Sequence, residues 1–183
     1  MSTYVILLRA VNVGGYGKLS MADLRKTLSA LKCKNIETYI QSGNAVVDSE
    51  LPATKVGPAI AHVLEQLAGA PVDVIVRTHD QLDQLIRANP FAPEAAAEGA
   101  RVHVAFLSAP AATTARAALE AIVQKYPSRR DRYHLAGDHI YFHFPDGAAD
   151  IKFAGKALDK AIGAVGTARN WNTVLKLHAM SKR

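Results

Sequence analysis

The order in which predicted strands and helices follow one another is the feature that most constrains the fold of this chain. Residues 4–10 are aliphatic and β-branched, which is typical of a buried strand. Leu24, Leu28 and Leu31 then recur at helical spacing after a start signal made by Ser20 and Asp23. The first set of predicted elements is completed by strands at 36–41, 45–48 and 72–76 and helices at 20–33, 54–67 and 79–88. Up to residue 78 this is the βαββαβ order of a ferredoxin-like unit.

The same order returns after residues 89–100, which contain two prolines and an Ala/Glu stretch and are predicted to be a linker. The second set comprises strands at 102–107, 132–136, 140–144 and 166–169 and helices at 113–124, 153–165 and 171–180. We therefore predict an α+β fold with two ferredoxin-like (βαββαβ) halves related by internal duplication, plus a C-terminal helix. The predicted boundaries are 1–88 for the first half, 89–100 for the linker and 101–183 for the second half with the C-terminal helix.

Two hairpin motifs support the duplication, although convergence on a favourable turn would give the same match. Tyr39-x-x-x-Gly43-Asn44 and Tyr133-x-x-x-Gly137-Asp138 share their spacing and their turn chemistry. In the second hairpin, the alternation of side chains directs Tyr133, Leu135, Ile140 and Phe142 to the helices and Arg132, His134, His139, Tyr141 and His143 to the other side. The equivalent outer side of the first hairpin would carry Ile40, Ala45 and Val47. We expect this apolar face to be covered by the second half, the C-terminal helix or another subunit, so an oligomer through the Ile40/Val47 face stays open.

Composition narrows the class of protein. Hydrophobic residues make up 49% and charged residues 21% of the 183 positions, which are ordinary globular values. No apolar run approaches the roughly 20 residues of a membrane helix, the first strand follows Met1 directly, and the lone Cys33 fits a reducing compartment. We therefore expect a cytoplasmic protein with no membrane partner. The net charge of +6 lies within residues 152–183, which suggests an anionic partner, but solvated helix faces give the same count.

A glycine-rich segment between the first strand and the first helix is the first candidate site. It contains Asn12, Gly14, Gly15 and Lys18, and Arg9 precedes it. Glycines allow a ligand to approach the backbone closely, and a helix start offers unpaired N–H groups to a phosphate or carboxylate. The segment departs from the P-loop and from G-x-G-x-x-G, and the alternative is a flexible connection to a capped helix.

The second candidate site is the polar start of the final helix, where Arg169, Asn170, Trp171 and Asn172 follow one another. A stacking ring, a bidentate donor and two amides suit a nucleotide or single-stranded nucleic acid. The alternative is structural, with Asn170 or Thr167 capping the helix and Trp171 anchoring the core.

Two further patterns favour simpler explanations. Lys152, Lys156 and Lys160 form a basic stripe that a solvated helix face explains best. His139 and His143 lie about 13 Å apart on a strand, too far to share one ion, so we predict no metal site.

Four motifs together resemble a known protein family. They are Leu8-Arg-Ala-Val-Asn-Val-Gly-Gly15, Met21-x-x-Leu24, Tyr39-Ile-Gln-Ser-Gly-Asn44 and Arg169-Asn-Trp-Asn-Thr-Val174. The chain resembles the bacterial proteins of domain-of-unknown-function family 1697 (DUF1697) over nearly its whole length, and departs from the family pattern at Ala10, where glycine is usual. The resemblance implies a small cytoplasmic bacterial protein and supplies no mechanism.

The leading hypothesis is a binding protein for a phosphorylated ligand, either a nucleotide or a nucleic-acid backbone, with no cofactor. Arg9 and the glycine-rich segment would bind the anion, Gln41, Ser42 and Asn44 would add amide and hydroxyl contacts, and the Arg169–Asn172 motif would form a second wall. The alternatives are an enzyme that uses the same motifs for acyl or phosphoryl transfer, which would lack a general base within them, and a protein-interaction module.

Overall fold

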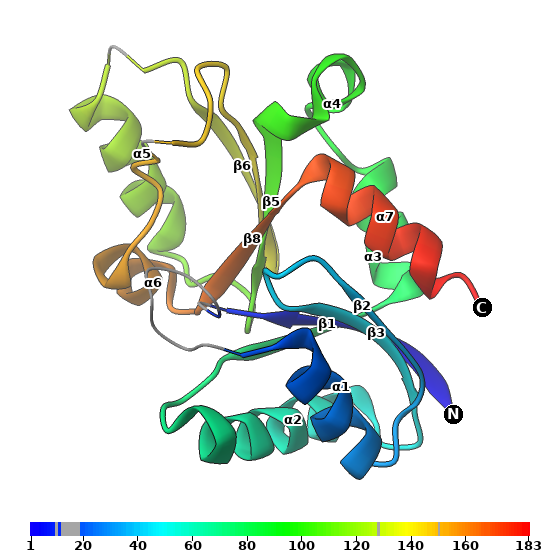
Figure 1. Ribbon diagram of the computed structural model, residues 1–183. Helices are drawn as coiled ribbons and strands as arrows, with labels where there is room; N and C mark the ends of the chain where they lie inside the picture. The colour runs from blue at the N-terminus through cyan, green and yellow to red at the C-terminus, as the bar shows by residue number, and fades with distance from the viewer. Residues whose placement is uncertain (10, 12–18, 128, 150) are drawn as a thin grey trace. The chain divides into compact units, whose positions relative to one another are not determined.

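The computed structural model describes residues 1–9, 11, 19–127, 129–149 and 151–183, which group into two compact units. Unit 1 comprises Met1–Arg87 with Leu175–Arg183, and unit 2 comprises Ala88–Val174. The described residues form two four-stranded antiparallel sheets and seven α-helices, so the fold is mixed α+β (Figure 1). Each unit is described by itself below.

Unit 1 contains the first sheet, whose strand order is β2-β3-β1-β4. Its elements are β1 (Ser2–Leu8), α1 (Met21–Ala30), β2 (Lys34–Tyr39), β3 (Asn44–Ser49), α2 (Ala53–Ala68), β4 (Val74–Thr78) and α3 (His79–Arg87). Ser20 caps α1 as predicted, because its hydroxyl accepts a hydrogen bond from the backbone N–H of Asp23 at 3.0 Å.

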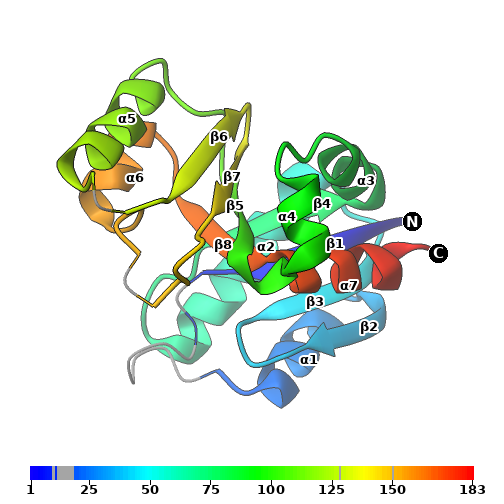
Figure 2. The ribbon, with the colours of Figure 1, turned by 90° about the horizontal axis from the view of Figure 1, so that it is seen from above.

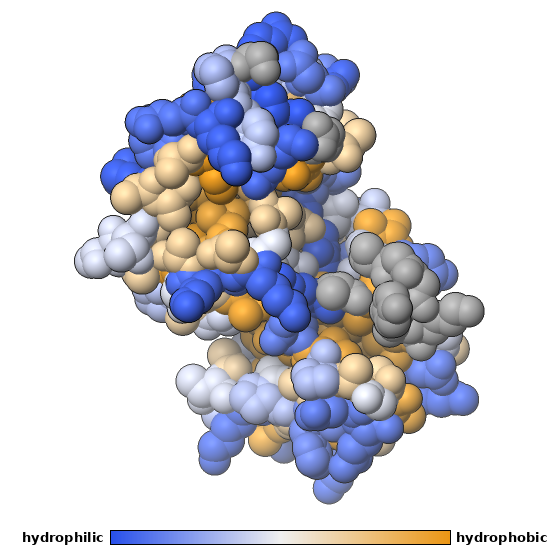
Figure 3. All heavy atoms as spheres, turned by 90° about the vertical axis from the view of Figure 1, so that its left-hand side faces the viewer, coloured by the Kyte–Doolittle hydropathy of each residue, from blue (hydrophilic) through white to orange (hydrophobic). Residues whose placement is uncertain are grey.

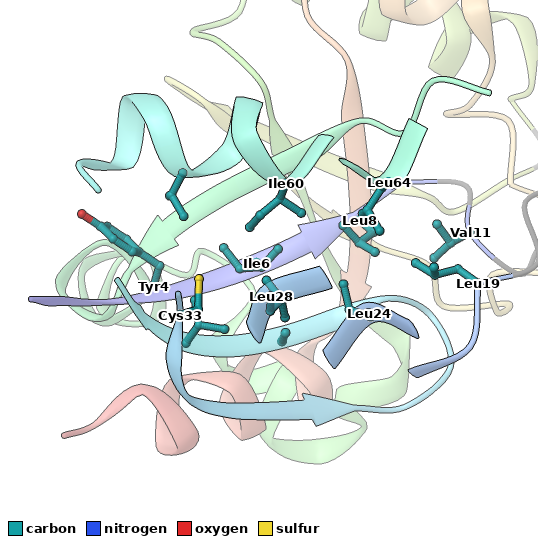
Figure 4. Packing of buried hydrophobic residues seen from close by; sticks show 13 residues of the cluster. Tyr4, Ile6, Leu8, Val11, Leu19, Leu24, Leu28, Cys33, Ile60 and Leu64 are labelled. Carbon is teal, nitrogen blue, oxygen red and sulfur yellow. The ribbon is translucent and has the colours of Figure 1, made fainter. Parts of the chain in front are cut away.

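The core of unit 1 lies between its sheet and the helices α1 and α2. Ile6 and Leu8 of β1 pack between Ile60 of α2 and Leu24 and Leu28 of α1 (Figure 4). Each of these side chains is at most 1% exposed, and burial of one such side chain contributes about 1.5–3 kcal/mol. The leucines at helical spacing on α1 and the alternating side chains of β1 therefore pack in one cluster.

The face predicted for the first hairpin is wrong. Val47 pairs with Tyr4 and Ala45 pairs with Ile6, so both point into the helix-covered core, where neither is exposed. Ile40 lies in the turn and is 49% exposed. The error comes from aligning the two hairpins by their Tyr-to-Gly spacing, because a shift of one residue in register moves every side chain to the opposite face.

The register also shows why that alignment fails. Tyr39 pairs with Asn44, which leaves four residues, 40–43, in the first turn. Ala136 pairs with His139, which leaves two residues, 137–138, in the second turn. The two tyrosines therefore occupy different positions, since Tyr39 ends its strand whereas Tyr133 lies near the start of β6 (Arg132–Ala136).

The second face of the first sheet is apolar as well. Val5 pairs with Val46 and both are fully buried, as is Leu7. Helix α3 and the C-terminal part of α7 (Trp171–Ser181) lie on this side of the sheet (Figures 1 and 2). The chain's own C-terminal segment therefore covers a face that would otherwise expose aliphatic side chains.

Unit 2 contains the second sheet, whose strand order is β6-β7-β5-β8. Besides β6 it comprises α4 (Ala92–Ala97), a 3₁₀ turn (Gly99–Arg101), β5 (Val102–Leu107), α5 (Ala115–Lys125), β7 (His139–His143), α6 (Lys156–Ile162), β8 (Gly166–Asn170) and the first turn of α7. Residues 89–100 thus include the helix α4. The predicted faces of the second hairpin are confirmed, because Tyr133, Leu135, Ile140 and Phe142 pack in the cluster under α5 and α6.

Candidate functional site

The glycine-rich segment begins and ends at the core of unit 1. Asn12, Gly14, Gly15 and Lys18 lie outside the described residues. The residues on either side of the segment, Val11 and Leu19, are 3% and 5% exposed and lie together at one end of the core cluster (Figure 4). Hydrophobic burial therefore fixes both ends of the segment beside the end of β1.

The β2–β3 turn approaches this point closely, because Gly43 has no side chain. The backbone N–H of Leu8 donates to the carbonyl oxygen of Gly43 at 2.8 Å. A Cβ atom on Gly43 would lie 2.7 Å from the Cβ of Leu8 and 2.5 Å from Cγ2 of Val11, and its φ of +79° also favours glycine. Only glycine allows the turn to contact the end of β1 in this way.

The turn is held by its own polar side chains. Asn44 is fully buried, and its Nδ2 donates to the carbonyl oxygen of Tyr39 and to the hydroxyl of Ser42, both at 3.0 Å. Gln41 is exposed. Arg9 follows Leu8, and its backbone N–H donates to the carbonyl oxygen of Asp73 at 3.0 Å. The structure thus brings Arg9 together with Gln41, Ser42 and Asn44 at one end of the first sheet.

The second predicted motif forms the junction of β8 and α7. Oδ1 of Asn170 accepts a hydrogen bond from the backbone N–H of Thr173 at 2.9 Å, which is the capping role considered from the sequence. Trp171 is only 6% exposed and anchors the start of the helix. Asn172 is exposed, and its Oδ1 lies where a Cβ on Gly99 would be. Asn170 and Trp171 therefore have structural roles.

Arg169 is the unusual member of that motif, because its guanidinium is buried. Its Nη1 donates to the hydroxyl of Thr167 and to the carbonyl oxygen of Ala168, both at 2.8 Å. Burial lowers the pKa of Arg169 to about 10. Desolvating a cation costs free energy, so a buried arginine is a candidate for a functional role. Arg169 lies in unit 2, whereas Arg9 and the β2–β3 turn lie in unit 1.

A hydrogen-bonded row on β7 was missed from the sequence. Nδ1 of His139 lies 3.1 Å from Oδ1 of Asp138, and its Nε2 lies 3.2 Å from the hydroxyl of Tyr141. Alternation along a strand places His139 and Tyr141 on one face, and that signal was available. The contribution of Asp138, the neighbouring turn residue, depends on the turn geometry. This row brings a carboxylate, an imidazole and a phenol into contact within unit 2.

Tyr141 gives a prediction for alkaline stability. Burial raises its pKa to about 12, so the folded protein favours the neutral phenol. Stability should therefore hold up to pH about 10, the unfolded value, and fall as the pH rises towards 12. Tyr141→Phe should cost about 1 kcal/mol at pH 7 through the lost hydrogen bond and should reduce the alkaline fall. Urea unfolding at pH 7 and pH 11 measures both effects. Tyr39→Phe is the control and should keep the full fall; an unchanged slope in Tyr141→Phe would contradict the prediction.

The lysine stripe behaves largely as a solvated face. Lys156 and Lys160 are exposed on α6, while Leu158 and Ile162 of the same helix are buried. The ammonium of Lys152 lies over the ring of Tyr126, 5.5 Å from its centroid. Seen from the side of α5 and α6, the surface alternates between hydrophobic and hydrophilic patches (Figure 3).

The described residues contain neither a metal-binding group of side chains nor a membrane-spanning helix. Within them, no group of three or more His, Cys, Asp or Glu side chains is arranged to hold a metal ion. None of the helices in the described parts of the chain is long and apolar enough to cross a bilayer.

Comparison with known proteins gives a family and a fold. The family model described as "Protein of unknown function (DUF1697)" matches residues 1–141. No curated protein matches the chain. Among solved structures, the conserved bacterial protein SP0830 from Streptococcus pneumoniae is similar over 99% of both chains, with 19% sequence identity and a TM-score of 0.67. At that identity the likeness concerns the fold alone.

Proposed function

The chain belongs to the DUF1697 family of proteins of unknown function, and we propose that it binds a phosphorylated ligand at the end of β1, beside the β2–β3 turn. The observation that carries the proposal is the glycine-only contact between Gly43 and Leu8. Gln41 and Ser42 precede Gly43 in the turn, and Arg9 follows Leu8 and leads into the glycine-rich segment with Lys18. Arginine binds phosphate bidentately, and hydroxyl, amide and backbone N–H groups complete such sites.

The Arg169–Asn172 motif lies in unit 2, and its role as a second wall stays a prediction outside this proposal. Trp171 is 6% exposed and offers little ring surface for base stacking, and Asn170 is occupied as a cap.

Binding is tested by calorimetric titration with AMP and with single-stranded poly(U) RNA at several salt concentrations. We expect Arg9→Gln and Lys18→Ala each to weaken binding by about tenfold or more, the loss of one charge-assisted contact. Lys26→Ala, at an exposed lysine of α1, is the matched control and should bind like the wild type. A polyanion ligand should weaken steeply as salt rises. No heat with either probe at millimolar concentration, or wild-type affinity in both site variants, would refute the site.

The Asp138–His139–Tyr141 row favours a second candidate function, an enzyme. His139 would be the general base, oriented by Asp138 through the 3.1 Å contact. Phosphate release from p-nitrophenyl phosphate or ATP that disappears in His139→Ala supports this alternative. Binding of AMP without turnover leaves the binding protein. The interaction-module alternative keeps only part of its predicted surface, because Val47 is buried whereas Ile40 is exposed.

We also propose that the chain contains two ferredoxin-like halves related by internal duplication, and two further observations support this proposal. The strand orders β2-β3-β1-β4 and β6-β7-β5-β8 correspond element by element, as expected for two ferredoxin-like halves. The 2.8 Å bond from Leu8 to Gly43 also has a counterpart from the N–H of Leu107 to the carbonyl oxygen of Asp138, again 2.8 Å. These correspondences support an internal duplication.

The single buried thiol of Cys33 supports a cytoplasmic location.

A further inference from the structure

Two histidines stack where the C-terminal part of α7 meets α3 in unit 1. The rings of His79, the first residue of α3, and His178, on α7, have centroids 4.4 Å apart and planes inclined by 14°. The side chain of His178 is 25% exposed. Because each ring covers a face of the other, a change in charge on one ring acts directly on the second.

One hydrogen bond and one ion-pair contact connect the two rings to the opposite helices. The hydroxyl of Ser181, a residue 1% exposed, donates to the carbonyl oxygen of His178 at 2.9 Å. The hydroxyl oxygen of Ser181 also lies 3.0 Å from Nδ1 of His79, so it accepts a hydrogen bond when that nitrogen carries a proton. Nε2 of His178 lies 3.5 Å from Oδ1 of Asp83 on α3. His79 is thus hydrogen-bonded to α7, whereas His178 lies within ion-pair distance of α3 and its Nε2 has no hydrogen-bond partner among the residues that the structure describes.

The surrounding charges do not neutralise a doubly protonated pair. Asp83 is the carboxylate nearest to His178, but it also forms a 2.7 Å ion pair with Arg87. Asp48 and Glu37 are engaged by the guanidinium of Arg183. The remaining charged groups on the packed elements are Asp80 of α3, Arg77 of β4, Lys176 of α7 and Lys182 after α7. Asp80 and Asp83 therefore face four basic residues, Arg77, Arg87, Lys176 and Lys182, so a second protonated ring adds to an excess of positive charge.

We propose that His79 and His178 form a pH-sensitive latch, which holds the C-terminal part of α7 against α3 while both rings are neutral and releases it when both are protonated. Two like charges at this separation repel each other. Release would uncover the second face of the first sheet, where Val46 is fully buried. A solvent-open hollow lined by His79, Ser181 and Lys182 gives protons access to the latch.

The direction of titration agrees with a latch that opens in acid. Burial and the neighbouring His79 and Lys182 lower the pKa of His178, against the opposing effect of Asp83. A base with a lowered pKa in the folded state contributes full stability above about pH 6.5, its unfolded value. That contribution falls as the pH drops through the range between the unfolded value and the lowered one.

Hydrogen exchange of the whole protein at pH 7.5 and pH 5.0 tests the latch. Protection factors for the amides of residues 177–181 should fall by about tenfold or more at pH 5.0, while those of β1 stay unchanged. The double variant His79→Gln/His178→Gln should lose this pH dependence. His62→Gln, at an exposed histidine on α2, is the matched control and should retain it.

A second measurement covers the case in which the double variant does not fold. Proton NMR titration of the wild-type protein should give a pKa for His178 below the usual value for histidine, and protonation of His178 should occur in the same pH range as the loss of protection. Equal protection of residues 177–181 at the two pH values, or unchanged pH dependence in a folded double variant, would overturn the latch.

Discussion

Gly43→Ala is expected to lower the free energy of unfolding by about 3 kcal/mol, the sum of a left-handed backbone cost and an overpacking cost. The φ of Gly43 is +79°, and its added Cβ would lie 2.7 Å from the Cβ of Leu8. That Cβ atom is fixed to the backbone of a residue that is only 1% exposed and is not the flexible end of a side chain, so the turn must move away from β1. Urea unfolding of the variant and the wild type measures the loss.

Gly137→Ala separates the two costs. Gly137 lies in the equivalent β6–β7 turn with a φ of +58°, and a Cβ there would meet nothing within 4 Å. We expect a loss of only about 1 kcal/mol, the backbone cost alone. Equal losses in the two variants would mean that the contact between the turn and β1 contributes nothing to stability.

Because the proposed ligand site depends on that contact, Gly43→Ala should also weaken AMP binding in the fraction that remains folded, whereas Gly137→Ala should not.

Local sequence patterns predicted most elements of the fold. The strands at 102–107 and 132–136 were predicted with their observed bounds, and Ser20 caps α1 as expected. Periodicity and capping act within a few residues of the chain, which is why the sequence alone reveals them. The predicted helix at 153–165 is shorter in the structure, Lys156–Ile162, because Gly155 and Gly163 have positive φ values at its two ends.

Predictions that required register or distant partners were less successful. The face assigned to Ala45 and Val47 was wrong, because the two turns differ in length and only the pairing of β1 with β3 fixes the register. The same holds for the candidate site. Asn44 and Ser42 were predicted as ligand contacts, and their hydrogen bonds inside the turn depend on a geometry that spacing does not reveal.

The role of the positive charges also depends on partners that are distant in the sequence. The excess positive charge of residues 152–183 suggested a surface for an anionic partner. Arg183, however, donates to Glu37 at 2.5 Å and to the carbonyl oxygen of Asn35 at 2.8 Å, and it lies 3.4 Å from Asp48. A charge at the end of the chain is therefore used to fasten the C-terminal segment to the first sheet.

Asp48 is the acceptor on which this fastening converges, and Asp48→Ala is expected to cost about 3 kcal/mol at pH 7, typical for removing one partner of a buried charge network. Asp48 is 8% exposed, and its carboxylate accepts hydrogen bonds from the hydroxyl of Thr3 at 2.8 Å and from Nδ2 of Asn35 at 2.6 Å. The substitution leaves those two donors without their acceptor and removes the carboxylate that lies 3.4 Å from Arg183. Urea unfolding at pH 7 measures the cost, and Glu50→Ala, at an exposed acid on the same strand end, should change stability by less than about 0.5 kcal/mol.

The pH dependence of this cost distinguishes the charge from the loss of packing. Burial alone would raise the pKa of Asp48, but hydrogen bonds from Asn35 and Thr3 and the charge of Arg183 outweigh it and hold the pKa below its usual value. A lowered pKa contributes stability above about pH 4 that is lost as the pH falls through the folded value. The difference between the wild type and Asp48→Ala should therefore shrink from pH 7 to pH 2.5. Asp48→Asn, which keeps the volume, should show the same convergence with a smaller loss at pH 7. A difference that stays constant with pH would show that Asp48 acts through its shape and not through its charge.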